Sequence, residues 1–255
     1  MALWIRFERG GQTGFGMLAN ETIQIHIGDM FDAPVASGET IALAEVSILT
    51  PCIPSKFIGL WNNFHAAAEK QGNAIPPEPL YFIKGANSYL AHGKAIRKPD
   101  SYDGKIIYEG ELGVVIGRQA RNVSIETADA FIFGYTCVND VTALDIITRD
   151  PTFAQWPRAK SFDTFGAFGP VIATGLDASP LVIRTLLNGR ERQNYPVSDM
   201  IFSPRSLVAA ISRELTLKPG DIISCGTSLG VGVLRAGMSV EVSIDGIGVL
   251  QNSVA

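Results

Sequence analysis

Apolar and polar residues alternate along much of the chain, and this pattern predicts a protein built mainly from β-strands. Such alternation is typical of strands that bury one face. In the first 140 residues, the predicted strands span residues 4–9, 22–27, 80–84, 106–116 and 131–138. The segment 165–250 is also dominated by strands, with turns predicted at residues 188–189, 219–220 and 245–246.

A few short segments are predicted to be helical instead. Residues 61–71 include an alanine-rich stretch that ends at Gly72, a typical stop signal at the C-terminus of a helix. Further helices are predicted at Ser124–Ala130, at 141–149 and near Ser206–Glu214. Helices are therefore expected to be few and short compared with the strands.

Prolines at positions 51 and 54 interrupt the pattern and mark a boundary. We therefore predict a small N-terminal β-rich region at residues 1–50 and a larger domain at residues 51–255. Residues 14–19, Gly-Phe-Gly-Met-Leu-Ala, resemble a glycine fingerprint for dinucleotides, but that fingerprint must open a helix. An alternating strand follows here, so a β-hairpin turn is predicted in its place.

Composition places the chain among ordinary globular proteins, with 46% hydrophobic and 18% charged residues over a length of 255. The net charge of −4 and the absence of a basic cluster argue against binding of nucleic acid. No apolar stretch has membrane-spanning length, and the charged N-terminus does not resemble a signal peptide. Three widely spaced cysteines indicate reduced thiols, so we expect a cytoplasmic protein.

Glu109 and Glu111 are the most informative pair of residues, because side chains two apart share one face of a strand. Two adjacent carboxylates are unfavourable unless a positive group such as a divalent cation lies between them. Asp140 follows the next predicted strand and could supply a third ligand. The alternatives are two solvated surface glutamates, and an Asp140 that caps the following helix, a role that Asn139 could fill equally well.

Four other side chains are candidates for catalysis or binding, and each has a simpler interpretation. His65 and Glu69 are four residues apart on the first predicted helix, where the carboxylate could orient the histidine as a general base. The same spacing also fits an ordinary surface pair. Lys160 and Lys84 lie near aromatic residues and could bind a carboxylate or enolate, or could simply be exposed.

Residues 226–230, Gly-Thr-Ser-Leu-Gly, match the G-x-S-x-G pattern of serine hydrolases. That pattern requires a helix after the serine and a histidine later in the chain. The glycine-rich sequence after Gly230 disfavours a helix, and the last histidine is His92. A serine triad is therefore rejected.

Five ordered motifs between about residues 55 and 254 resemble those of the fumarylacetoacetate hydrolase family. The matching segments are Tyr108–Gly117 (E-x-E-L-x-x-V-I-G), Gly134–Ala143 (G-Y-x-x-x-N-D-x-S/T-A), Ala159–Pro170 (K-x-x-D-T/G with a later G-P), Asn188–Gln193 (N-G-x-x-x-Q) and Leu217–Gly232 (L-x-P-G-D-x-I-x-x-G-T-P-x-G-V-G). The chain is most similar to the branch of bacterial fumarylpyruvate hydrolases and 2-hydroxyhepta-2,4-diene-1,7-dioate isomerases.

This resemblance implies an α+β fold, a mixed and strongly bent β-sheet roll with few helices, in a protein that is usually dimeric. It implies that Glu109, Glu111 and Asp140 bind Mg²⁺ or Mn²⁺. It also implies that Lys160 binds substrate near the metal and that Thr227 contacts substrate from a loop. The substrates would be 2-oxo acids with a second carbonyl or enol nearby, and the cation would stabilise an enolate.

The sequence departs from the family pattern around the expected substrate. The His65–Glu69 spacing differs from the usual N-Y-x-x-H-x-x-E, and Ser228 replaces the proline of G-T-P. Leu144 and Ile147 stand where some family hydrolases have Arg and Gln. These differences lie where hydrolases, decarboxylases and isomerases of the family would diverge.

Three functions are therefore open. The first is Mg²⁺-dependent hydrolysis of a C–C bond in an acylpyruvate such as fumarylpyruvate, in the breakdown of aromatic compounds, with His65 activating water. The second is isomerisation or decarboxylation of a 2-oxo-dienedioate or of oxaloacetate at the same metal site. The third is a family member without catalytic activity that still binds metal.

Overall fold

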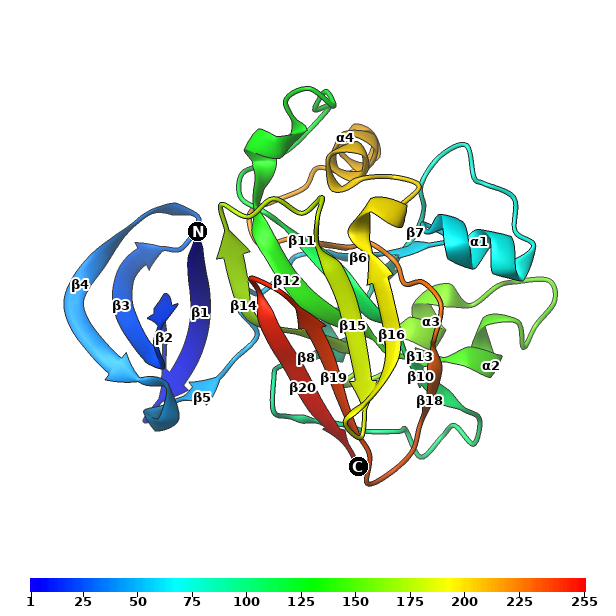
Figure 1. Ribbon diagram of the computed structural model, residues 1–255, viewed down its shortest axis with the longest axis horizontal. Helices are drawn as coiled ribbons and strands as arrows, with labels where there is room; N and C mark the ends of the chain where they lie inside the picture. The colour runs from blue at the N-terminus through cyan, green and yellow to red at the C-terminus, as the bar shows by residue number, and fades with distance from the viewer.

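The computed structural model describes residues 1–255 and contains three β-sheets (Figure 1). The largest consists of β1 (Ala2–Arg9), β2 (Gln12–Ala19), β3 (Thr22–Asp29), β4 (Asp32–Ala42), β5 (Ser47–Ile48), β6 (Phe57–Trp61), β7 (Leu80–Lys84), β8 (Tyr89–Leu90), β11 (Gly110–Ile116), β12 (Ile132–Asp140), β14 (Gly166–Thr174) and β17 (Ile222–Ser224). Its main path runs β4-β3-β2-β1-β14-β12-β11-β17-β6-β7. The N-terminal strands, blue in Figure 1, therefore continue the sheet that contains β11 and β12.

Two smaller sheets complete the fold. The first contains β10 (Ile106–Tyr108), β13 (Thr142–Ala143) and β18 (Gly232–Leu234), and the second contains β9 (Ala95–Ile96), β15 (Val182–Leu187), β16 (Arg190–Pro196), β19 (Ser239–Ile244) and β20 (Gly248–Val254). Most neighbouring strands are antiparallel, but β17 pairs with β6, β14 with β8, and β20 with β9 in parallel. The predicted mixed-sheet fold is confirmed.

Helices are few and short. They are α1 (His65–Gln71), α2 (Leu144–Ile147), α3 (Trp156–Lys160) and α4 (Pro204–Glu214), with short 3₁₀ turns η1 (Leu43–Glu45), η2 (Ala86–Ser88), η3 (Ala128–Phe131) and η4 (Val197–Asp199). Gly72 ends α1 in the left-handed conformation, with φ of 69°, as its lack of a Cβ permits. None of the helices reaches the length and apolarity that a membrane crossing would require.

Several sequence-based element predictions differ from the structure. The strand predicted at residues 106–116 is interrupted at Glu109, so that β10 and β11 belong to different sheets. The glycine-rich segment 14–19 lies within β2, and the turn is formed by Gly10 and Gly11 instead. The helix predicted at 124–130 is reduced to turns and η3. The helix predicted at 141–149 is replaced by β13 and the four-residue α2.

Strand β11 is buried along its whole length, and this burial fixes the position of the candidate site. Val114 packs into the main apolar core, whereas Val115 packs into a second cluster with Trp4 and Val138. Because consecutive side chains point to opposite faces, β11 is covered on both sides. A strand that is packed on both faces holds the residues at its N-terminal end rigidly in place.

Candidate metal centre and substrate site

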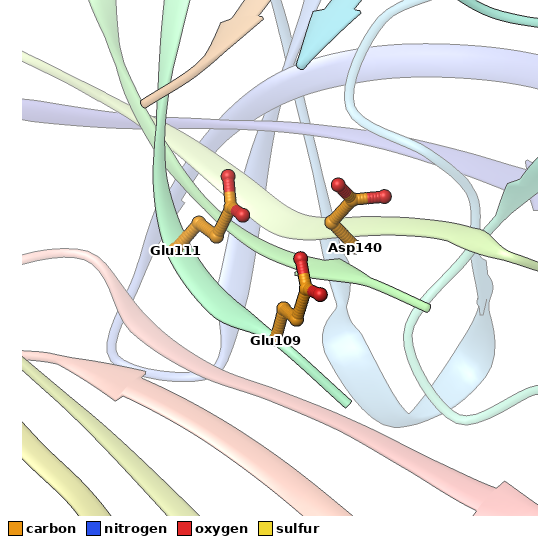
Figure 2. Close-up of side chains that lie close together, drawn as sticks. All are labelled: Glu109, Glu111 and Asp140. Carbon is orange, nitrogen blue, oxygen red and sulfur yellow. The ribbon is translucent and has the colours of Figure 1, made fainter. Parts of the chain in front are cut away.

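The carboxylates of Glu109, Glu111 and Asp140 come together, with one oxygen from each lying within 4.8 Å of the others. Figure 2 shows the three side chains directed toward a common space. Glu109 lies at the break between β10 and β11, Glu111 is near the start of β11, and Asp140 ends β12. Pairing of β11 with β12 brings them together, and Asp140 N donates to Glu109 O at 2.9 Å.

Burial makes this negative cluster costly by itself. Burial, followed by the charges of Asp140 and Glu109, raises the pKa of Glu111 well above its usual value. Burial also raises the pKa of Glu109, although the neighbouring Lys160 opposes that shift. Burial alone would raise the pKa of Asp140, but the charges of Lys160 and Lys84 lower it overall. Further positive charge in this space would therefore stabilise the ionised carboxylates.

The hydrogen bonds of Glu111 leave one of its oxygens free. Its Oε2 accepts hydrogen bonds from Ser224 Oγ and from Gly226 N, the latter at 2.9 Å. Its Oε1 is buried and has no hydrogen-bond partner. An unpartnered carboxylate oxygen in a buried cluster of oxygens fits the preference of Mg²⁺ and Mn²⁺ for oxygen ligands. These residues therefore fit a divalent cation.

Two buried lysines surround Asp140. Lys160, at the end of α3, places its Nζ 2.5 Å from Glu109 Oε2 and 2.7 Å from Asp140 Oδ2. Burial would lower the pKa of Lys160, but the nearby Asp140 and Glu109 raise it above its usual value. Lys84, on β7, donates to Asp140 Oδ1 and to the backbone carbonyl of Lys160. The default interpretation that these lysines are exposed is therefore wrong.

The two lysines are placed differently with respect to a substrate. Lys160 contacts the same carboxylates that would bind the cation, as expected for a group near the reacting atoms. The side chain of Lys84 is fully buried, and its contacts hold Asp140 and the end of α3 in place. A substrate contact by Lys84 stays a prediction.

Thr227 lies in the loop formed by residues 226–230, which packs against the segment that contains Glu109 and Glu111. Its hydroxyl donates to the carbonyl of Gly110 at 3.0 Å and accepts from Gln193 Nε2 at 2.9 Å. Tyr195 OH contacts both Gly110 O and Thr227 Oγ1. Sequence reasoning missed the roles of Tyr195 and Ser224, since neither residue type nor spacing distinguishes them.

His65 and Glu69 do not form the predicted pair in this conformation. Both residues are exposed on α1, and no hydrogen bond or ion pair joins their side chains. The start of α1 is nevertheless connected to the site, because the ring of Phe64 packs edge-on against Tyr195 with centroids 4.9 Å apart. A catalytic role for His65, with Glu69 as its partner, stays a prediction.

The apolar positions that follow Asp140 have different environments. Leu144 is 45% exposed, whereas Ile147 is only 8% exposed and belongs to the core. Thr142, two residues before Leu144, donates to Glu109 Oε1 at 3.2 Å. Leu144 is thus a short distance along the chain from a residue that contacts the carboxylate cluster.

Comparison with known proteins identifies the family. Residues 56–255 match the model of the fumarylacetoacetate (FAA) hydrolase C-terminal family, which is most of the chain. The chain belongs to the fumarylacetoacetate hydrolase family. Residues 3–51 match a separate model, described as Rv2993c-like, N-terminal. The family resemblance that the motifs indicated is thus confirmed.

Members of the fumarylacetoacetate hydrolase family that are similar to this chain carry out different reactions. The oxaloacetate tautomerase YisK of Bacillus subtilis is 37% identical over 227 residues, covering 84% of this chain and 74% of that protein. The 2-hydroxyhepta-2,4-diene-1,7-dioate isomerase of Mycobacterium marinum is 34% identical, with a TM-score of 0.91 over 100% of this chain and 98% of that chain. Fumarylpyruvate hydrolase of Pseudomonas aeruginosa, solved with Mn²⁺ and pyruvate, is 28% identical, with a TM-score of 0.73 over 79% of this chain and 90% of that chain.

Proposed function

We propose that this protein is a divalent-cation-dependent enzyme that interconverts the keto and enol forms of a 2-oxo acid, with oxaloacetate as the first candidate. The observation that carries the proposal is the contact of the Lys160 ammonium group with Glu109 and Asp140. The raised pKa of Lys160 keeps this group protonated at neutral pH. A fixed positive charge in a buried site stabilises the negative charge that develops on the oxygen of an enol or enolate.

The surrounding residues have complementary roles in this proposal. Glu109, Glu111 and Asp140 would hold Mg²⁺ or Mn²⁺, which would supply a positive centre that polarises the 2-oxo carbonyl. Lys160 would donate a hydrogen bond to the substrate, and Thr227 would orient it from the loop 226–230. The Mn²⁺ and pyruvate in the P. aeruginosa hydrolase support this assignment, since pyruvate is itself a 2-oxo acid.

Two observations favour tautomerisation over hydrolysis: the arrangement of His65 and Glu69 on α1, and the sequence identities to known enzymes. Hydrolysis of a C–C bond requires an activated water, and an oriented histidine is the usual base. Here the side chain of His65 makes no hydrogen bond to Glu69. In addition, the B. subtilis tautomerase and the M. marinum isomerase have a higher sequence identity to this chain, 37% and 34%, than the P. aeruginosa hydrolase, at 28%. Decarboxylation of oxaloacetate would use the same groups and is included in the test.

Hydrolysis of an acylpyruvate such as fumarylpyruvate is the second candidate. It is supported by the packing of Phe64, the residue before His65, against Tyr195 at the edge of the site. In that case His65→Ala would lower turnover by roughly 10²–10⁴-fold. Tautomerisation without a role for His65 predicts that His65→Ala leaves turnover close to that of the unmodified protein.

The deciding experiment assays purified protein with oxaloacetate and with a panel of acylpyruvates, each with Mg²⁺ and with Mn²⁺. Loss of the enol absorbance reports tautomerisation, and mass spectrometry identifies cleavage or decarboxylation products. Glu111→Gln should weaken Mn²⁺ binding at least ~10-fold in calorimetry, because it removes a charged ligand. Glu191→Gln, an exposed change on β16, is the control. An unchanged Mn²⁺ affinity in Glu111→Gln, or conversion of none of these substrates, would contradict the proposal.

Two further properties are proposed, one from the family and one from the cysteines. We expect a homodimer, because members of this family are usually dimeric, and a cytoplasmic protein, because the three cysteines are free and buried.

A further inference from the structure

Gln193, on β16, connects the segment that carries the two glutamates with the loop that carries Thr227. Gln193 is 1% exposed, and both ends of its carboxamide make hydrogen bonds. We propose that Gln193 is a positioning residue that fixes the distance between the metal centre and the Thr227 hydroxyl. The substrate part of this inference rests on the proposed function, whereas the part that concerns metal binding does not.

The orientation of the Gln193 amide is set by its partners. Its Oε1 accepts from Gly110 N at 3.0 Å and from Thr185 Oγ1 at 2.8 Å. Its Nε2 donates to Thr227 Oγ1 at 2.9 Å and to the carbonyls of Ser228 and Leu229, each at 3.3 Å. A backbone N–H can only donate and a carbonyl can only accept, so the flipped amide would face like groups on both sides. The two ends of Gln193 therefore act on two different segments.

On the metal side, Gln193 acts on the peptide unit between the glutamates. Gly110 N is held by Gln193, and Gly110 O accepts from Thr227 and Tyr195. The fit is tight, since a Cβ at position 110 would overlap the hydroxyl of Thr185. Because Gly110 separates Glu109 from Glu111, a shift of this peptide would change the separation of their carboxylates.

On the loop side, Gln193 is the donor for three consecutive residues. Without its amide group, the buried carbonyl of Ser228 and the part-buried carbonyl of Leu229 would lose a partner. An unsatisfied buried acceptor is unfavourable, so the loop would move to reach water. Thr227 would then lie farther from the carboxylates that bind the cation.

The experiment separates these two actions with two variants in the full chain. Gln193→Glu keeps an oxygen toward Gly110 N and Thr185 but places a second oxygen against the loop carbonyls. Gln193→Met has a similar size and removes both sets of hydrogen bonds. Asn194→Asp is the matched amide-to-acid control, because Asn194 is the exposed neighbour on the same strand.

Three measurements are made on each variant: Mn²⁺ affinity by calorimetry, hydrogen–deuterium exchange of residues 226–230, and kcat and KM for the best 2-oxo acid. We expect faster exchange of the loop in both variants. We expect Mn²⁺ affinity to fall ~10-fold in Gln193→Met and to stay within ~3-fold in Gln193→Glu. KM should rise ~10-fold in Gln193→Glu, with a smaller change in kcat, since a binding contact is displaced.

Each measurement can contradict a different part of the proposal. Loop exchange in Gln193→Glu equal to that of Asn194→Asp, or Mn²⁺ affinity in Gln193→Met equal to that of the control, would overturn the positioning role. A KM in Gln193→Glu equal to that of the control would overturn its effect on substrate. If the unmodified protein converts no 2-oxo acid, the proposed function fails, and Mn²⁺ affinity and exchange still decide the role of Gln193.

Discussion

Among individual residues, the three cysteines are sealed from solvent by the packing around them. Burial raises the pKa of the Cys52 thiol from 9.0 to about 12; among the smaller effects, the charge of Arg6 lowers this pKa and that of Asp221 raises it. Burial raises the pKa of Cys137 from 9.0 to about 12 as well. The thiolate is the reactive form of cysteine, so these residues should be inert in the native protein.

This burial predicts a specific dependence of reactivity and stability on pH. Native Cys52 and Cys137 should react with a thiol reagent at pH 8 at least ~10³-fold more slowly than the denatured chain, as measured by absorbance. Because the folded state holds these protons more tightly, the contribution to stability is complete below pH 9.0 and is lost as the pH rises toward about 12. Rapid labelling of either thiol at pH 8 without denaturant would contradict this expectation.

The sequence predicted which carboxylates come together at the candidate metal centre, but not the residues that support them. Glu109 and Glu111 could be recognised because two charges interrupt an apolar strand, and Asp140 because it ends the next strand. The burial of Lys84 and Lys160 could not be predicted, because it depends on contacts between segments 76 residues apart. Gln193 appeared only as part of a motif, since its role depends on β16 lying beside β15 and the loop 226–230.

Among the secondary-structure elements, α1 is anchored by the residue two positions before its start. Asn63 Nδ2 donates to Cys225 O at 2.8 Å and to Phe202 O at 3.2 Å, and its Oδ1 accepts from Phe202 N at 2.8 Å. Asn63 is 1% exposed, so water cannot replace it easily. One side chain thus joins the start of α1 to the end of β17 and to the segment before α4.

Asn63→Ala should destabilise the protein, because it leaves the buried carbonyl of Cys225 and the part-buried backbone groups of Phe202 without partners. The expected loss is roughly 1–3 kcal/mol in the free energy of unfolding for each such group. Urea denaturation measures this loss. Asn73→Ala is the control, because the side chain of Asn73 makes only an exposed hydrogen bond to Gln71. A change below about 0.5 kcal/mol, which is typical of a surface substitution, would show that Asn63 does not anchor α1.

Elements with a clear pattern of apolar and polar residues were predicted correctly, whereas elements whose structure depends on tertiary contacts were not. The predicted strand at 80–84 coincides with β7, and the predicted helix near 206–214 lies within α4. A helix was predicted over residues 141–149, but residues 142–143 pair with β10 and leave only α2 as a helix. Glu109 breaks its strand because its neighbours pair with different partners, β18 on one side and β12 on the other.

At the scale of the whole molecule, the N-terminal region is part of the central sheet. Strand β1 pairs with β14 through four residue pairs, from Ala2 with Thr174 to Ile5 with Val171. Trp4 and Ile5 are both buried. The boundary predicted near residue 51 therefore does not separate two independent cores, although residues 3–51 match a family model of their own.

Removal of residues 1–50 should therefore expose the edge of β14 and lower the stability of the remaining chain. An unpaired strand edge promotes aggregation. We expect a lower melting temperature in calorimetry and a larger, polydisperse species in light scattering. Full-length protein with Val35→Thr, a change at an exposed position of β4, is the control. The prediction would be contradicted if the shortened chain had the same melting temperature as the unshortened chain and remained monodisperse.

The hydrogen bonds that hold Glu111 have a consequence for biosynthesis. Ser224 and Gly226 contact this glutamate from 113 and 115 residues farther along the chain. At a ribosomal rate of about 5–20 residues per second, Glu111 emerges roughly 6–23 s before the groups that fix its carboxylate. A nascent chain that ends before residue 224 would lack the contacts that fix this carboxylate, so a cation site of the proposed kind would form only after that part of the chain has been made.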